Sequence, residues 1–333
     1  PLGLEKVGAY FFMETYEPYD GTSFTAKVGR AHGSPFGLWR HPTQAIPEAA
    51  ALSSPYPESL SPILYGLAAL MNGGGAVYGM FDGPVEMRRD LMKSICTEVK
   101  KRVDYMGGQT VKYLALHYSQ QVRDFGPDSG PEQVLRISRG AYDMLNESHL
   151  LVDVVFDSQL TMEKLSPYRV LFLSESTCLS DEQCRQIRAF ATRGGTVIAT
   201  GRTSLYDEFG VQRDNFAMAD LFGVDYRGPE AGGKRHGVLY VPQTKALKQF
   251  GYIIAFAGHD WQVSLRGDAR AKVLCTRSSL KGSEPLNDFD SKGDYDSGQP
   301  TVVMNHVGKG KVIYISGDVG GGYIHNPHPP LKR

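Results

Sequence analysis

The sequence lacks the charge and the long apolar runs that a nucleic-acid or membrane partner would require. Its 333 residues include 36 lysines and arginines against 36 aspartates and glutamates, so the formal net charge is zero at pH 7. Phosphate binding needs clustered, uncompensated basic side chains, and we therefore expect no nucleic-acid partner. No apolar run reaches the roughly 18 to 20 residues of a membrane-spanning helix, so we also expect no membrane partner.

Cysteine is scarce as well. The four cysteines are Cys96, Cys178, Cys184 and Cys275, and the spacing of Cys178 and Cys184 matches no zinc-binding pattern. We interpret them as mostly free, packed thiols, and we expect no metal and no cofactor. The chain opens at Pro1 without a basic and apolar leader, which indicates a processed protein or an excerpt of a longer one. The sequence therefore does not indicate a compartment.

The first hundred residues alternate strand-like and helical patterns. Short apolar runs predict strands at residues 7–13, 35–39 and 76–81, and helices are predicted at 61–71 and 85–105. The first of these helices has Ser61 as N-cap, Pro62 at its first position, and Asn72 followed by three glycines at its end. About three strands are too few to close a (β/α)8 barrel, so residues 1–108 would form the end of one.

A second series of strands and helices begins at about residue 109. Strands are predicted at 113–118, 152–156, 168–173 and 196–199, and helices at 132–148 and 180–192. Ser180 is the expected N-cap of the last helix, with Gln183 as its capping-box partner. Strands separated by helices predict an α/β fold with a doubly wound parallel sheet, whose ligand crevice lies at the C-terminal ends of the strands.

The rest of the chain is richer in β-structure. Strands are predicted at 237–241, 272–276, 301–306 and 311–316, and the glycines between the last two predict a hairpin. Residues 278–299 are polar and predict an exposed loop. The glycine run at 320–322 follows the hairpin and is not expected to join a strand to a helix, which argues against a phosphate-binding loop.

The functional residues of a (β/α) barrel lie where its strands end. Suitable side chains follow each predicted strand of the first segment: Glu14, Tyr16, Glu17 and Asp20, then Trp39, Arg40 and His41, then Asp82. Carboxylates serve acid and base catalysis, an aromatic ring stacks on a sugar, and Arg or His recognises hydroxyls, so the pattern predicts a carbohydrate site. The alternative stays open that these carboxylates are loop or cap residues, that Trp39 is a buried ring and that His41 is a loop residue.

A doubly wound sheet can instead carry a cysteine nucleophile on a tight strand-to-helix turn. The turn after residues 196–199 reads Thr200-Gly-Arg-Thr and contains no cysteine. Cys178 and Cys184 flank the start of a predicted helix, where the helix dipole lowers the pKa of a thiol. A thiol hydrolase or amidotransferase that uses Cys178 is therefore a further hypothesis, which requires this thiol to be exposed beside a histidine.

Three runs of the second segment carry a family resemblance: Tyr168-Arg-Val-Leu-Phe-Leu-Ser, Leu179-Ser-Asp-Glu-Gln and Phe190-Ala-Thr-Arg-Gly-Gly-Thr-Val-Ile-Ala-Thr-Gly. They resemble the trimerisation domain of bacterial beta-galactosidases. Asp207-Glu-Phe-Gly, Leu221-Phe-Gly-Val and Gly308-Lys-Gly-Lys-Val-Ile-Tyr-Ile-Ser-Gly-Asp are similar to the continuation in a broader group of glycoside hydrolases. In the first segment, Phe12-Met-Glu-Thr, Trp39 and Gly73-Gly-Gly-Ala-Val-Tyr-Gly-Met-Phe-Asp-Gly resemble the last part of the catalytic barrel of that group, fucosidase-like members included.

The resemblance implies a glycoside hydrolase barrel followed, at residues 109–333, by a flavodoxin-like, class I glutamine amidotransferase-like domain without amidotransferase chemistry. We expect this domain to be truncated at its C-terminus and to assemble a homo-oligomer, a trimer by resemblance, that helps to shape a neighbour's active site. Retaining hydrolases of this kind place a nucleophilic glutamate after the seventh barrel strand. If residues 76–81 are the eighth strand, the seventh ends in Trp39-Arg-His, and Glu14 ends the sixth.

The leading hypothesis is a glycoside hydrolase with a carbohydrate substrate. Glu14 is the best visible acid or base, Asp82 or Glu17 supports it, and Trp39 is the stacking platform; the partner carboxylate is expected upstream of Pro1, because hydrolysis needs a pair of carboxyl groups about 5 to 9.5 Å apart. We do not expect the chain as given to catalyse alone. The alternative is a catalytically inactive carbohydrate-binding or assembly protein, since the expected glutamate after the seventh strand is missing.

Overall fold

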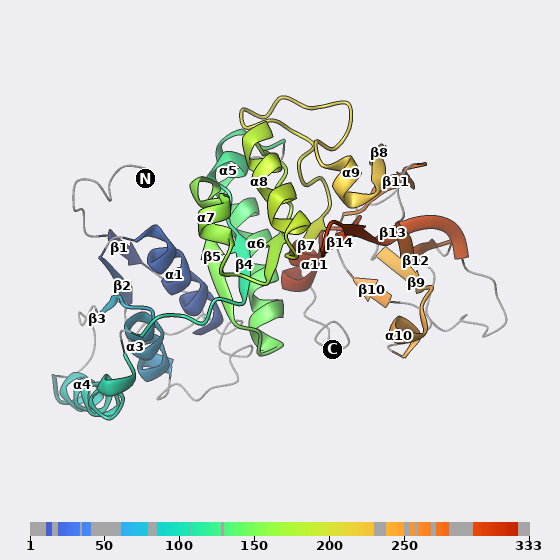
Figure 1. Ribbon diagram of the computed structural model, residues 1–333. Coiled ribbons are helices and arrows are strands. Elements are labelled where there is room, and N and C mark those ends of the chain that lie inside the picture. The colour runs from blue at the N-terminus through green and yellow to red at the C-terminus, as the bar shows by residue number, and fades with distance from the viewer. Residues whose placement is uncertain are drawn as a thin grey trace. The chain divides into compact units, whose positions relative to one another are not determined.

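The computed structural model divides into two compact units, Pro1–Val111 and Lys112–Arg333. It describes residues 11–14, 19–33, 35–40, 61–78, 85–106, 108–127, 130–229, 238–249, 254–256, 259–267, 271–279 and 296–325. Both units combine helices with β-strands, and the larger sheet of the second unit has a parallel core (Figure 1). The predicted mixed α/β fold is confirmed at this level.

Strands and helices alternate along the first unit. Its described elements are β1 (Phe11–Glu14), α1 (Tyr19–His32), β2 (Phe36–Arg40), α3 (Ser61–Met71), β3 (Gly75–Tyr78), α4 (Val85–Lys100) and the 3-10 turn η2 (Val103–Tyr105). The strands are parallel and lie in the order β1-β2-β3. Because parallel strands run in one direction, their C-terminal ends meet at the same edge of this sheet.

Helix α1 is an element that the sequence analysis missed. Asp20, a candidate strand-end carboxylate with a loop or cap residue as the alternative, lies in the first turn of α1. Gly21 and Gly29 lower the intrinsic helix propensity of this segment. Phe24 is only 1% exposed and α1 packs against α3, so tertiary burial, worth about 2 kcal/mol for such a side chain, outweighs the weak local preference.

Helix α3 begins and ends where the sequence predicts. Gly73 adopts a left-handed φ of 81°, and the N–H groups of Gly73 and Gly74 donate to the carbonyls of Leu70 and Ala69 at 3.0 Å each. These bonds satisfy carbonyl groups that the helix end leaves open. Helix α4 is shorter than expected, because it ends at Lys100 and residues 103–105 form the separate turn η2.

The second unit contains a nine-stranded sheet in the order β10-β9-β12-β13-β14-β7-β6-β4-β5 and a two-stranded sheet of β8 and β11. The strands are β4 (Leu114–His117), β5 (Val152–Val155), β6 (Val170–Leu173), β7 (Thr196–Thr200), β8 (Val224–Pro229), β9 (Val238–Pro242), β10 (Ile254–Phe256), β11 (Trp261–Leu265), β12 (Lys272–Ser278), β13 (Asp296–Val307) and β14 (Gly310–Ile315). The helices are α5 (Gln120–Phe125), α6 (Pro131–Glu147), η3 (Asp157–Gln159), α7 (Met162–Leu165), α8 (Asp181–Thr192), α9 (Ala219–Phe222), α10 (Lys245–Lys248) and α11 (Val319–His325).

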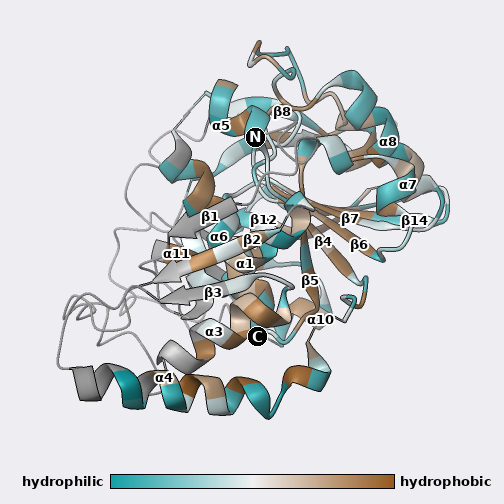
Figure 2. Ribbon diagram, turned by 90° about the vertical axis from the view of Figure 1, so that its left-hand side faces the viewer, coloured by the Kyte–Doolittle hydropathy of each residue, from teal (hydrophilic) through white to brown (hydrophobic). Residues whose placement is uncertain are grey.

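The parallel part of the large sheet runs from β14 through β7, β6 and β4 to β5. The chain proceeds from β4 to β5 on one side and then to β6 on the other, so the strand order reverses between β4 and β6. The core around these strands includes Leu171, Val197, Val312 and, from α8, Ile187, each fully buried. Figure 2 shows β6 and β7 as hydrophobic strands, as expected for a parallel sheet covered on both faces.

Helix α8 is capped as the sequence predicts. The Ser180 hydroxyl accepts from the Gln183 N–H at 3.2 Å, and the Gln183 side chain accepts from the Ser180 N–H at 2.7 Å. The predicted hairpin is also confirmed, since β13 and β14 are antiparallel neighbours joined at Val307 and Gly310. Gly308 in that turn has a left-handed φ of 58°.

One expectation for the C-terminal part was wrong in part. Residues 296–299 were expected in a loop, but they belong to β13, where Asp296 pairs with Ser278; residues 280–295 lie outside the described part. The glycine run at 320–322 lies inside α11, the helix that follows β14, and so does not form a loop between that strand and the helix. Glycine is required there by packing, because a Cβ on Gly320 would lie under 3.0 Å from the carbonyl oxygen of Ile137 on α6.

Candidate functional site

The strand ends of the first unit bring part of the predicted carbohydrate site together. Glu14 is the last residue of β1, and it is the register partner of Trp39 on β2. Trp39 in turn pairs with Val77 on β3, and Arg40 pairs with Tyr78. The backbones of Glu14, Trp39 and Arg40 therefore lie on neighbouring strands at the C-terminal edge of this sheet.

The remaining predicted site residues cannot be placed in this way. Tyr16, Glu17, His41 and Asp82 lie outside the described residues. Tyr78 is a strand-end residue that the sequence analysis did not consider, because the predicted third strand extended beyond it to residue 81. Its position level with Arg40 makes it a neighbour of the candidate site.

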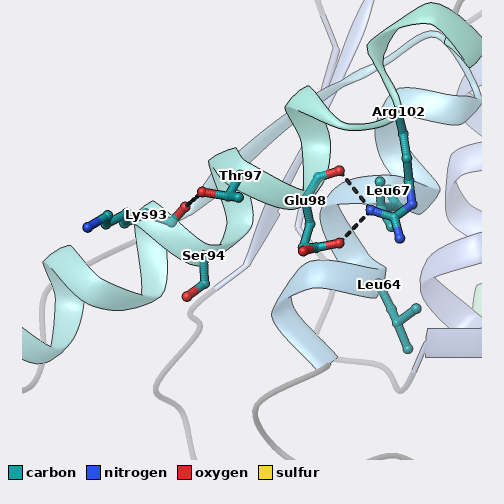
Figure 3. Close-up of a pocket in the computed structure, with 7 residues that line it drawn as sticks. All are labelled: Leu64, Leu67, Lys93, Ser94, Thr97, Glu98 and Arg102. Carbon is teal, nitrogen blue, oxygen red and sulfur yellow. Dashed lines mark hydrogen bonds and ion pairs between the residues drawn. The ribbon is translucent and has the colours of Figure 1, made fainter.

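The first unit also has a groove on its helical side. It has a volume of about 610 Å³ and is lined by residues of α3, of α4 and of the turn that follows: Leu64, Leu67, Lys93, Ser94, Thr97, Glu98 and Arg102 (Figure 3). Arg102 pairs with Glu98 at 2.6 Å, and hydrogen bonds from Lys101 and Arg102 lower the pKa of Glu98. The described residues that line this groove are not among the predicted site residues.

A buried polar cluster lies where β4, β5 and β6 of the second unit end. The Ser176 hydroxyl is 2.8 Å from Nδ1 of His117, and Nε2 of His117 is 3.2 Å from Oδ1 of Asp157. This second contact has an ion-pair distance but not the alignment of a hydrogen bond. Ser119 donates to Oδ1 of the same carboxylate at 2.6 Å, and the Gln120 N–H donates to Oδ2 at 2.6 Å.

The carboxylate of Asp157 is the centre of this cluster. Burial raises its pKa, but the contacts with His117 and the hydrogen bonds from Ser119 and the Gln120 N–H outweigh burial, and the net shift of the pKa is downward. Asp157 is therefore charged at neutral pH. Its negative charge lies at the start of α5, where free backbone N–H groups stabilise an anion.

Serine, histidine and aspartate are the residue types of a hydrolytic triad, but this arrangement does not have that geometry. In a triad the serine contacts Nε2 and the aspartate contacts Nδ1, whereas His117 has these contacts exchanged. Ser176 and His117 are each 1% exposed, so a substrate does not reach them. The cluster ties three strand ends together at the point where the strand order reverses.

A second cluster surrounds the turn that follows β6. Glu175 has a left-handed φ of 49°, which is uncommon for a residue other than glycine. Its N–H donates to the Thr200 hydroxyl at 3.0 Å, and its carboxylate accepts from the backbone N–H of Arg202 at 3.0 Å and from the Arg202 guanidinium at 3.2 Å. The guanidinium lies 4.8 Å from the ring centre of Trp261, within cation–π range.

A sharp strand-to-helix turn of this kind is where some hydrolases hold a nucleophile. Here the residue with the left-handed φ is a glutamate whose two carboxylate oxygens are both engaged, and it is only 4% exposed. Sequence reasoning missed Glu175 and Arg202 because the search of this unit was for cysteine. A polar residue directly after a buried strand was the available signal.

The thiol hypothesis does not meet its own condition. Cys178 is fully buried, and burial raises its pKa. Cys184, inside α8, is 1% exposed, and burial raises its pKa to about 11. Both thiols are free, as is Cys275, which is buried too, while Cys96 is exposed. The four thiols are free as predicted, and three of them are packed while Cys96 is not; Cys178 lacks the exposure that the thiol hypothesis requires.

Two further findings concern only the part of the chain that the structure describes. There, no group of three or more His, Cys, Asp or Glu side chains could hold a metal ion. No helix there is long and apolar enough to cross a membrane.

Comparison with known proteins gives the context of both units. No family model matches the chain. Beta-galactosidase BglY of Alicyclobacillus acidocaldarius is 26% identical over 133 residues, which is 39% of this chain and 17% of that protein. The solved beta-galactosidase of Bacillus circulans sp. alkalophilus matches 94% of this chain and 48% of its own, with a TM-score of 0.69 at 15% identity.

The resemblance to beta-galactosidase-like proteins is confirmed. The alpha-L-fucosidase isoenzyme 2 of Paenibacillus thiaminolyticus has the same fold over 99% of this chain and 49% of its own, with a TM-score of 0.69 at 18% identity. At these identities the likeness is one of fold. The chain spans about half the length of the solved structures that it matches.

Proposed function

We propose that the chain is part of a glycoside hydrolase that cleaves O-glycosidic bonds by carboxylate acid and base chemistry. The observation that carries this proposal is the shared fold, over 94 to 99% of the chain, with a beta-galactosidase and a fucosidase. Under this proposal, residues 1–108 are the end of a (β/α)8 barrel. Three parallel strands alternating with helices support this assignment.

Glu14 is the proposed acid or base, and Trp39 is the proposed stacking platform for a sugar ring. Their register pairing at the C-terminal edge of the sheet supports a common site, since barrel enzymes carry their catalytic residues there. Arg40, His41 and Tyr16 are proposed to bind substrate hydroxyls, with Glu17 and Asp82 as supporting carboxylates. The second carboxylate of the pair is proposed to come from a part of the protein outside this chain.

The second unit is proposed to be an amidotransferase-like assembly domain without amidotransferase chemistry. Its parallel strand order, β5-β4-β6-β7-β14, follows the 2-1-3-4-5 pattern of flavodoxin-like sheets. The buried Cys178 and the engaged carboxylate of Glu175 support the absence of a nucleophile. Phe125 and Phe209, 48% and 69% exposed with ring centres 6.1 Å apart, offer an apolar surface for assembly, in line with the proposed trimer.

The test is hydrolysis of a panel of aryl glycosides by the protein in its full natural length. Glu14→Gln is compared with wild type and with Glu132→Gln, which makes the same change at an exposed position on α6. We expect kcat/KM to fall by about 10³-fold or more in the folded Glu14 variant, because loss of an acid or base removes transition-state stabilisation. The control is expected to keep wild-type activity. Equal activity in the two variants would exclude the role of Glu14.

One observation favours a second candidate, a catalytically inactive carbohydrate-binding or assembly protein. β2, which lies between β1 and β3, ends in Trp39 and Arg40 rather than in the glutamate expected after a seventh barrel strand. Under this alternative, the wild-type protein hydrolyses none of the glycosides but shows a sugar-dependent rise in melting temperature. Trp39→Ala would abolish that rise, since the ring is the proposed sugar platform.

A further inference from the structure

Four basic side chains lie at the N-terminal ends of three neighbouring strands in the second unit. β6, β7 and β14 are consecutive in the parallel part of the large sheet. Because these strands are parallel, their N-terminal ends meet at one edge of the sheet. The four side chains are exposed there, and we call them the basic edge: Arg169 before β6, Arg193 before β7, and Lys309 and Lys311 at the start of β14.

Backbone contacts hold the residues of the basic edge together. The Arg169 carbonyl accepts from the Thr196 N–H of β7 at 2.9 Å. The Lys309 N–H donates to the Thr192 carbonyl at 3.0 Å, and Lys311 is the register partner of Thr196. Neighbouring strands are about 4.8 Å apart, so the backbones that carry these charges span about 10 Å from β6 to β14.

The charges of the basic edge are not compensated within the part of the chain that the structure describes. There, none of its four side chains has an ion-pair or hydrogen-bond partner. Two acidic residues of the same unit, Asp153 of β5 and Glu163 of α7, already pair with Lys112 at 3.0 Å and with Lys164 at 3.4 Å. The formal net charge of zero thus conceals a local excess of positive charge.

The C-terminus of α8 explains only half of this group. Arg193 is the C-cap of α8, and Lys309 binds the carbonyl of Thr192, the last residue of that helix, through its backbone N–H. The negative end of the helix dipole stabilises cations at this place. Arg169 and Lys311 lie at strand ends, and strands have no comparable dipole. Like charges this close repel one another, so the fold alone gives no reason for these two, whereas an anionic ligand does.

Tyr113 adds an aromatic ring beside the basic edge. It directly precedes β4, the neighbour of β6, and its carbonyl accepts from the N–H groups of Arg169 at 2.8 Å and Val170 at 3.1 Å. Its side chain is 41% exposed. An exposed aromatic ring stacks on the apolar face of a sugar, and cations bind carboxylate or sulfate oxygens. The two kinds of side chain together fit a sugar polymer that carries negative charges.

We propose that the basic edge and Tyr113 form a surface that binds an acidic polysaccharide through its carboxylate or sulfate groups. The choice of a polysaccharide over other polyanions rests on the proposed glycosidase function. The surface belongs to the second unit alone, so it holds a polymer without taking part in hydrolysis. A single-stranded nucleic acid presents negative charges and flat bases to the same groups, and it is therefore the competing ligand in the test.

The test is isothermal titration calorimetry of the full chain with polygalacturonate, dextran sulfate, neutral dextran and a single-stranded oligonucleotide. We expect both acidic polysaccharides to bind and neutral dextran not to bind. Each engaged cation contributes about 0.7 to the slope of log affinity against log salt, so four cations predict an affinity about 50-fold weaker at 200 mM than at 50 mM NaCl.

Two matched double variants locate the binding surface. Lys309→Gln/Lys311→Gln removes two of the four cations, so the loss of affinity between the two salt concentrations should shrink to about sevenfold. Lys245→Gln/Lys248→Gln makes the same change at exposed positions of α10 and should keep the wild-type affinity and salt dependence. Tyr113→Ala should weaken binding at an unchanged salt dependence, because it removes stacking and no charge. Circular dichroism checks that each variant is folded.

Three outcomes would overturn the proposal. One is that wild type binds neither acidic polysaccharide at 50 mM NaCl, a result that needs no variant. The second is equal weakening in the two double variants, which means attraction by overall charge rather than by the basic edge. The third is tighter binding of the oligonucleotide than of both polysaccharides, which assigns the surface to nucleic acid. None of these results bears on Glu14, because the small aryl glycosides that test its role do not need this surface.

Discussion

The crossing of α6 and α11 offers the sharpest test of how the second unit is packed. Gly140→Ala adds one methyl group at a point where its position would be well under 3.0 Å from Gly320 O and 3.2 Å from Cβ of Ile324. The nearest atom belongs to the backbone, so no side-chain rotation relieves the overlap, and α11 must shift. Overpacking of this kind costs about 1 to 3 kcal/mol.

Alanine also favours the helix more than glycine does, by about 1 kcal/mol. Because the overlap is with backbone atoms, we expect an overpacking cost in the upper part of that range, about 2 to 3 kcal/mol, and therefore a net loss of about 1 to 2 kcal/mol in the free energy of unfolding. Urea denaturation followed by circular dichroism measures it as a lower transition midpoint at unchanged slope. Gly267→Ala is the matched control, because a Cβ there meets nothing within 4 Å and its expected change is within about 0.5 kcal/mol. A Gly140 variant as stable as the control would refute the packing of α11 on α6.

Three other predictions concern buried charges and thiols. Burial raises the pKa of Asp318, so the folded protein keeps a proton that the unfolded chain loses. The contribution of Asp318 to the free energy of unfolding should therefore fall by up to about 4 kcal/mol from pH 4 to pH 7 and stay level above pH 7. Urea titrations of wild type and Asp318→Asn at pH 5 and pH 8 measure this fall, and equal changes in the two proteins would contradict the prediction. Arg202→Met leaves the buried Glu175 carboxylate without its cation and should lower the free energy of unfolding by about 3 to 5 kcal/mol in the same assay. An unchanged urea midpoint would contradict this prediction. Iodoacetamide under native conditions should label the exposed Cys96 and spare Cys178 until urea unfolds the chain, as peptide mass spectrometry would show; native labelling of Cys178 would mean that this thiol is accessible.

The elements found from the sequence are those whose ends carry their own signal. Helix α8 has both halves of its capping box, and α3 ends at glycines that adopt the left-handed conformation. Helix α1 offered no comparable cap signal, and Gly21 and Gly29 lower its intrinsic helix propensity. It exists because Phe24 is buried in the unit, which is information that only the tertiary structure holds.

The candidate sites also contain some neighbours that the sequence predicted and others that it did not. Glu14, Trp39 and Arg40 could be grouped from the sequence, because each lies at the end of a predicted strand and parallel neighbouring strands end at one edge of a sheet. The pair of Ser176 and His117 is separated by 59 residues along the chain, and that of Ser119 and Asp157 by 38. Such pairs depend on strand order, which the sequence pattern alone did not determine.

The two units use polar residues at strand ends in opposite ways. In the second unit, His117, Asp157 and Glu175 follow parallel strands as catalytic residues do, yet each is buried and bonded to its neighbours. At exposures of 1 to 7%, these side chains have little surface that a substrate could reach. Glu14 in the first unit is therefore the strand-end residue that we propose for the chemistry, while the buried polar residues at the strand ends of the second unit stabilise its fold.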